Sequence, residues 1–117
     1  MDCTHQDFED GVRVIRLTGR MDIEGNERIA LPLTVAARSS GGAVVVDLAG
    51  VDFLASVGIG TLVSLAQSVQ LHKGRLVLCG ANEQVRRALE RMNMATLIPL
   101  YREVVEARTA IATPSAE

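Results

Sequence analysis

The chain has 117 residues, a hydrophobic fraction of 48% and a formal net charge of −2 at pH 7. This length predicts a single domain, and the apolar content excludes a chain that is disordered throughout. Binding to a phosphate backbone requires clustered positive charge, which this composition lacks, so no nucleic acid is expected as a partner.

No export signal is expected at the start of the chain. Residues 1–10 are polar and acidic, without a basic start or an apolar run. No apolar stretch reaches the ~18 residues that cross a bilayer. The two cysteines, Cys3 and Cys79, are too few for a disulfide framework. We therefore expect a cytoplasmic protein with no membrane insertion.

The first half of the chain predicts a strand, a helix and a second strand. Residues 12–17, VRVIRL, have the β-branched pattern of a strand, and a short strand around Phe8 is expected to precede it. Apolar residues at helical spacing predict a helix over residues 24–38, which Pro32 should kink or shorten. Residues 43–48, AVVVDL, form a continuous apolar run that is typical of a strand buried on both faces.

The second half repeats this alternation. A helix that ends near His72 is predicted to bury one stripe, comprising Ile59, Leu62, Val63, Ala66 and Val69. Residues 75–79 predict a buried strand, and Asn82 is a suitable N-cap for a helix that buries Val85, Leu89 and Met92. Residues 96–98 predict a short strand, and residues 101–111 a final helix.

The resulting order, β-β-α-β-α-β-α-β-α, predicts the α/β class. Strands that alternate with helices favour parallel crossovers, so we expect a small mixed, largely parallel sheet with about four helices packed against it. The whole chain, residues 1–117, is predicted to be one domain. Residues 1–7 and 112–117 are expected to be flexible ends.

Ser56 is predicted to stand where a strand-exit loop passes into a helix. Serine is a good N-cap there, and a helix N-terminus also favours negative charge. Gly58 and Gly60 follow, and they are expected to let another molecule approach the first turn closely. The plain alternative is a helix cap followed by two packing glycines.

Three segments of the chain carry a family pattern: VVVDLAGVDFLASVGIGTLVSL at residues 44–65, IRLTGRMD at 15–22 and GRLVLCGANEQVRRALERMNM at 74–94. Together they resemble the STAS domain of anti-sigma factor antagonists. The resemblance implies a STAS-like fold and partner switching. In that mechanism the unphosphorylated form binds a serine kinase or anti-sigma factor of the histidine-kinase-like ATPase type. Phosphorylation of a serine releases it, and a metal-dependent serine phosphatase reverses the mark.

Carried over to this chain, the phosphorylated serine of the family falls on Ser56. The glycine after it falls on Gly58, and the aspartate that closes the G-x-x-D corner falls on Asp22. Where relatives often have DSSG or DSTG, Ala55 and Val57 leave Ser56 as a single hydroxyl. The expected partner-binding surface comprises Asp22, Ser56, Val57, Gly58, Gly60, Thr61, Ser64, Gln67 and Ser68.

Other classes of site have weaker support. His5 and His72 are isolated, and Asp47 and Asp52 are interpreted as strand and loop residues, so no catalytic site and no enzyme activity are expected. The cysteines and histidines lie too far apart in sequence for a metal site.

Two alternatives remain open. The GIG at residues 58–60 lacks the remainder of a phosphate loop, so no cofactor is expected, although weak nucleotide binding near Asp22 and Ser56 is not excluded by the residues. The main alternative function is a non-phosphorylated STAS subunit of a scaffold or lipid-transport assembly, in which Ser56 is silent.

Overall fold

The computed structural model describes residues 1–112. Its strands form one five-stranded sheet in the order β1-β2-β3-β4-β5. β1 runs antiparallel to β2, and the other neighbours are parallel. The predicted mixed, largely parallel sheet with four helices is thereby confirmed. The elements are β1 (Asp2–Asp7), β2 (Val12–Met21), α1 (Ile23–Arg38), β3 (Ala43–Leu54), α2 (Ser56–Leu71), β4 (Arg75–Cys79), α3 (Glu83–Arg91), the 3₁₀ helix η1 (Met94–Thr96), β5 (Leu100–Tyr101) and α4 (Val104–Ala112).

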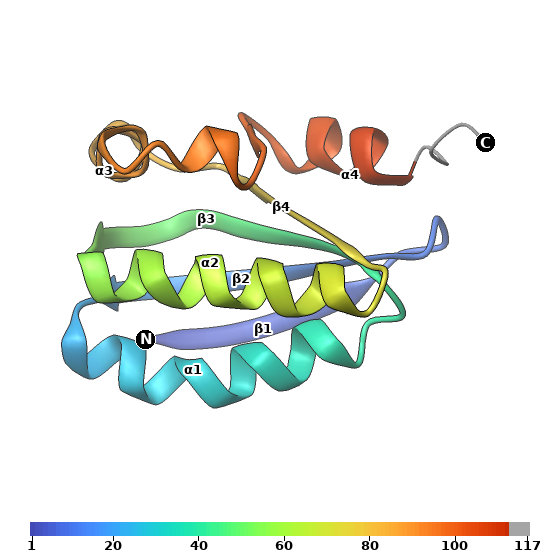
Figure 1. Cartoon of the computed structure of the whole chain (residues 1–117), viewed down its shortest axis with the longest axis horizontal. Coiled ribbons are helices and arrows are strands. Elements are labelled where there is room, and N and C mark those ends of the chain that lie inside the picture. Colours follow the sequence, from blue (N-terminus) through green and yellow to red (C-terminus); the bar gives the residue numbers. More distant parts are fainter. Residues whose placement is uncertain (113–117) are drawn as a thin grey trace.

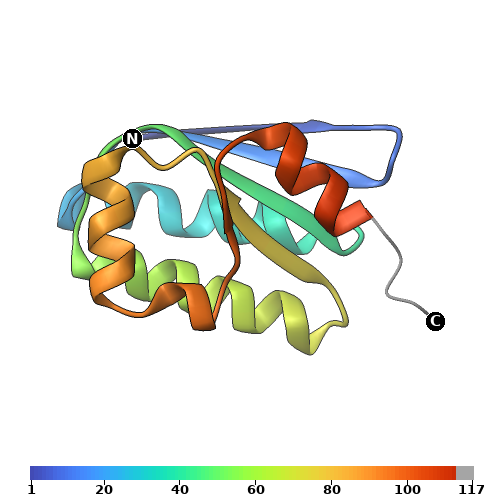
Figure 2. The ribbon, with the colours of Figure 1, turned by 90° about the horizontal axis from the view of Figure 1, so that it is seen from above.

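Apolar side chains cover both faces of the sheet. α1 and α2 lie side by side over one face, with Leu33 and Leu62 in the larger buried cluster (Figure 2). α4 covers the opposite face, and the strands lie between α1 and α4 (Figure 1). The apolar run of β3 is explained by this arrangement, because Val44 belongs to the first cluster and Val45 to the second.

β3 is longer than the sequence predicts. It extends from Ala43 to Leu54, so Asp52 is a strand residue and not a loop residue. Beyond Asp47, β3 no longer pairs with β4 and continues beside β2 alone, until Leu54 lies opposite Met21. This extension carries the chain to the place where α2 begins.

The expectation of a flexible end at residues 1–7 is wrong, because residues 2–7 form β1. The polar sequence DCTHQD has little strand character of its own, but it pairs with β2 along its whole length. Phe8 lies in the connecting turn, where Gly11 adopts a positive φ of +83° and its N–H donates to the Phe8 carbonyl (3.1 Å). At the other end, Ala112 closes α4, and residues 113–117 of the expected flexible end lie outside the described residues.

α1 continues through Pro32 to Arg38, so of the two expected effects of Pro32, a kink or a shorter helix, the shortening is wrong. Pro32 cannot donate to the carbonyl of Arg28, but both residues are exposed and water can bond that carbonyl instead. Within residues 1–112, none of the helices combines the length and apolar character that crossing a bilayer requires.

The region after α3 differs most from expectation. Asn93 turns the chain with a positive φ of +57°, so Met92 is 52% exposed and Met94 takes the buried position instead. The strand predicted at 96–98 is replaced by η1 and by β5 at Leu100–Tyr101. Because Tyr101 pairs with Cys79 in the sheet, the last helix begins at Val104 and not at 101.

Candidate functional site

The candidate site lies where β2 and β3 end and α1 and α2 begin. Parallel neighbours end at the same edge of a sheet, and the backbone N–H of Ala55 donates to the carbonyl of Met21 across this edge (3.0 Å). One residue, Asp22, separates β2 from α1, and one residue, Ala55, separates β3 from α2. The positive ends of two helix dipoles therefore emerge at one edge of the sheet.

Ser56 is the first residue of α2 and not its N-cap, so the interpretation of this serine as a helix cap is wrong. Ala55 occupies the N-cap position and offers no side-chain bond. Ser56 is exposed, and its hydroxyl makes no hydrogen bond to any residue between 1 and 112. This hydroxyl is therefore accessible to a modifying enzyme without the loss of any internal contact.

Replacing Ser56 by alanine should leave the free energy of unfolding within about 0.5 kcal/mol of wild type, because no internal bond is lost. Asn82→Ala is the matched control, since Asn82 is a true N-cap whose Oδ1 accepts from the N–H of Val85 (2.8 Å). That variant should lose about 1 kcal/mol. Urea unfolding followed by circular dichroism measures both. A comparable loss in the two variants would mean that Ser56 does cap α2.

Asp22 is the N-cap of α1. Its Oδ1 accepts from the N–H of Gly25 (2.8 Å), and its Oδ2 lies 3.7 Å from Nε of Arg20. The hydrogen bond from Gly25, and after it the nearby positive charge of Arg20, lowers the pKa of the Asp22 carboxyl below its ordinary value. Asp22 thus has a structural role at the site, with 42% of its side chain still exposed.

The two glycines of α2 have opposite environments. Gly58 is buried, and a Cβ there would lie 2.8 Å from Cδ1 of Leu54 and 2.8 Å from Cγ of Met21. The expectation that Gly58 offers its backbone to a partner is therefore wrong, because it packs α2 onto the strand ends. Gly60 is exposed with nothing within 4 Å of its Cβ position, as expected for a surface glycine.

The outer face of α2 carries no charged side chain. All sixteen residues of the helix are uncharged, and its exposed or half-exposed residues include Val57, Gly60, Thr61, Ser64, Gln67 and Ser68, as the sequence predicts. A shallow groove runs between this face and Thr34 of α1. Thr34 was not predicted as a site residue, because the sequence of α1 does not show that Thr34 would face α2. We call this region the α2 surface.

Thr61 is less available than the other residues of the α2 surface. Its Oγ1 donates to Oδ1 of the buried Asn26 in α1 (2.6 Å), which ties the N-terminal parts of the two helices together. Asn26 was not singled out in the sequence, because a polar residue inside a predicted helix gives no signal of burial. The hydroxyl of Thr61 is thus already engaged within the protein, in contrast to that of Ser56.

Arg20 is a third residue that the sequence did not indicate. Its guanidinium lies 4.6 Å from the ring centroid of Phe53, the residue opposite it in the sheet. This cation–π contact holds the positive charge of Arg20 close to the C-terminal end of β3, shortly before α2 begins at Ser56. The pairing of Arg20 with Phe53 depends on the register of β2 and β3, which short-range patterns do not reveal.

The remaining reactive groups do not assemble around this site. Burial and the neighbouring carboxylate of Asp47 raise the pKa of the Cys79 thiol to about 12, which removes it as a nucleophile. Asp47 accepts from the N–H of Ala49 (3.0 Å) and lies 3.6 Å from Nε of Arg16. These two contacts of Asp47 are therefore with residues of β2 and β3. Asp52 is exposed on β3.

Comparison with known proteins relates the chain to one family. The family model of the STAS domain matches residues 6–107. The Anti-sigma F factor antagonist of Paenibacillus polymyxa is 24% identical over 102 residues, covering 86% of this chain and 87% of the relative. The crystal structure of an anti-sigma factor antagonist from Mycobacterium paratuberculosis superimposes with a TM-score of 0.85 at 24% identity, covering 94% and 92% of the two chains.

The fold is also shared with SpoIIAA from Bacillus, an anti-sigma factor antagonist solved in two states. The unphosphorylated form gives a TM-score of 0.74 at 17% identity, covering 93% of this chain and 96% of that one. The phosphorylated form gives 0.69 at 17% identity, covering 94% and 99%.

Proposed function

Because the chain belongs to the STAS domain family, we propose that it is a partner-switching anti-sigma factor antagonist of the cytoplasm and not an enzyme. Its unphosphorylated form binds a serine kinase or anti-sigma factor of the histidine-kinase-like ATPase type through the α2 surface. Phosphorylation of Ser56 releases that partner, and a metal-dependent serine phosphatase restores binding. The observation that carries this proposal is the exposed hydroxyl of Ser56, which lies at the start of an uncharged helix and makes no hydrogen bond within residues 1–112.

A phosphate on Ser56 is compatible with the fold. It adds about −1.5 to −2 charges at the positive end of the α2 dipole, where negative charge is favourable by roughly 0.3–1 kcal/mol. The effect of phosphorylation therefore falls on the surface and not on the stability of the domain. A partner packed against Val57 and Gly60 would have to remove this dianion from water, which weakens the complex.

Two relatives support this assignment. The curated relative from Paenibacillus polymyxa is named for antagonism of an anti-sigma factor. SpoIIAA, which has the same fold, exists in phosphorylated and unphosphorylated forms. The accessible hydroxyl of Ser56 gives this chain the chemical group that such a modification needs.

The test is capture of partners from the native cytosol with wild type, Ser56→Ala and Ser56→Asp as baits. Gln70→Glu serves as the charge control, because it adds one negative charge to an exposed position in the same helix away from Ser56. We expect wild type, Ser56→Ala and Gln70→Glu to retain a protein with a histidine-kinase-like ATPase domain, and Ser56→Asp to lose it. Incubation of the captured protein with ATP should then phosphorylate the wild type but not Ser56→Ala, as measured by intact mass.

Retention of the same proteins by all four baits would contradict the switch. It would favour the alternative, a STAS subunit of a scaffold or lipid-transport assembly in which Ser56 is silent. Loss of the partner by Gln70→Glu as well as Ser56→Asp would show that overall charge, and not the position of Ser56, controls binding.

A further inference from the structure

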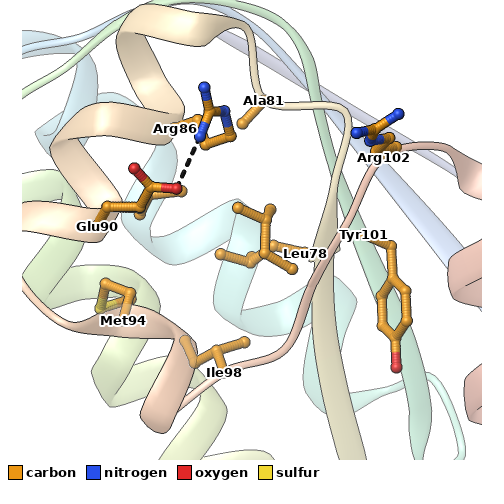
Figure 3. A pocket seen from close by; sticks show the side chains of 10 residues that line it. Leu78, Ala81, Arg86, Glu90, Met94, Ile98, Tyr101 and Arg102 are labelled. Atoms are coloured by element: carbon orange, nitrogen blue, oxygen red, sulfur yellow. Dashed lines mark hydrogen bonds and ion pairs between the residues drawn. The ribbon is translucent and has the colours of Figure 1, made fainter.

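A cavity of about 300 Å³ lies between α3, η1 and β5, and no residue of α1 or α2 contributes to it. Its floor is apolar and includes Leu78 of β4, Met94 of η1 and Ile98 after it (Figure 3). Leu89 of α3 also lines it. These side chains belong to the main buried cluster. The cavity therefore lies against the edge of the core, whose side chains here are at most 2% exposed.

The rim of this cavity is charged and carries an excess of positive charge. Arg86 and Arg102 lie on either side of Ala81, and Glu90 faces Arg86 (Figure 3). Nη1 of Arg86 donates to Oε2 of Glu90 at 2.7 Å, one turn along α3. The guanidinium of Arg102 makes no hydrogen bond or ion pair with any residue between 1 and 112. The charge of Arg86 is thus already neutralised by Glu90, and the guanidinium of Arg102 is available to a ligand.

We propose that this cavity binds a small molecule with one carboxylate on an apolar body. An apolar cavity with few polar groups at its mouth is the usual form of a small-molecule site, and this volume is at the lower end of the usual range. At roughly 30 Å³ per water-sized group, it holds about ten non-hydrogen atoms. The apolar body fills the floor, and the carboxylate lies at the mouth, where Arg102 forms a charge-assisted hydrogen bond.

The charge of the rim selects the sign of the ligand. Two guanidinium groups and one carboxylate leave a net positive charge, which repels an amine with the same apolar body. Glu90 opposes the proposed ligand, because it competes for Arg86 and repels a second carboxylate. Removing the charge of Glu90 should therefore strengthen binding, which a merely apolar cavity would not do.

The test uses octanoate as the probe, with octylamine and 1-octanol as controls of equal chain length. Titrations of the isotope-labelled full chain are followed by ¹H–¹⁵N NMR. We expect saturable shifts in α3, η1 and β5 with octanoate, and much weaker ones with octylamine. Arg102→Gln should weaken octanoate binding about tenfold, since a hydrogen bond between charged groups is lost. Glu90→Gln should strengthen it several-fold.

Arg87→Gln is the matched control. Arg87 lies beside Arg86 on α3 and makes an equivalent ion pair with Glu83, but it does not line the cavity. Its loss should leave octanoate binding unchanged. Ala81→Leu should block binding by filling the mouth, and an unchanged spectrum outside the cavity would verify that this variant folds. Equal shifts with octanoate and octylamine, shifts confined to the α2 surface, or equal effects of Arg87→Gln and Arg102→Gln would each overturn the proposal.

Discussion

Replacing Gly25 by alanine is expected to lower the free energy of unfolding by about 3 kcal/mol. Gly25 lies in the first turn of α1, and a Cβ there would overlap the carbonyl oxygen of Arg20 and lie 3.2 Å from Oδ1 of Asp22. A backbone carbonyl cannot rotate away as a side chain can, so the start of α1 must shift. The shift also breaks the bond by which Asp22 caps this helix. Urea unfolding at pH 7 measures the loss.

Gly60→Ala is the control, since it is the same substitution in the neighbouring helix. Gly60 is exposed, and nothing lies within 4 Å of its Cβ position. Because alanine loses less conformational entropy in a helix than glycine, this variant should be more stable than wild type by about 0.5–1 kcal/mol. Similar changes in the two variants, of either sign, would show that the crowding at Gly25 is not what determines its effect.

Thr61→Val is expected to lower the free energy of unfolding by about 1–3 kcal/mol. The substitution keeps the shape of the side chain but leaves Oδ1 of the buried Asn26 without its 2.6 Å hydrogen bond. Ser64→Ala, which removes an exposed hydroxyl one turn further along α2, should change stability by less than about 0.5 kcal/mol. Thermal and urea unfolding of both variants measure the difference.

A double-mutant cycle separates the hydrogen bond from other effects of these changes. Asn26→Leu combined with Thr61→Val removes both partners, so no buried polar group is left unpaired. We expect the double variant to lose less stability than the sum of the two single variants. Strict additivity would show that Asn26 and Thr61 do not stabilise the contact between α1 and α2.

Most of the sheet could be predicted because its central strands carry their own signal. The apolar runs at 43–48 and 75–79 need burial on both faces, and the two clusters on either side of the sheet supply it. β1 could not be predicted in the same way, because its polar residues become a strand only through pairing with β2. The last part of β3 escaped prediction for a similar reason, since only β2 supports it there.

The residues of the candidate site were proposed from the family resemblance, and their geometry could not be. The resemblance to the STAS domain is confirmed by the family match and the shared fold, and it pointed to Ser56 as the residue to inspect. The position of Ser56 one residue inside α2 depends on where β3 ends, and that boundary is set by tertiary pairing. The burial of Gly58 depends on Met21, which is remote in sequence and adjacent in space.

The absence of charge along α2 has a consequence for how fast a complex on the α2 surface would form. Without electrostatic steering, association should proceed at the modest rates of neutral surfaces and should respond little to ionic strength. Differences in affinity between competing partners would then arise from their residence times. A phosphate on Ser56 would be the first charge on this helix, so salt dependence of the association rate would itself distinguish the modified protein from the unmodified one.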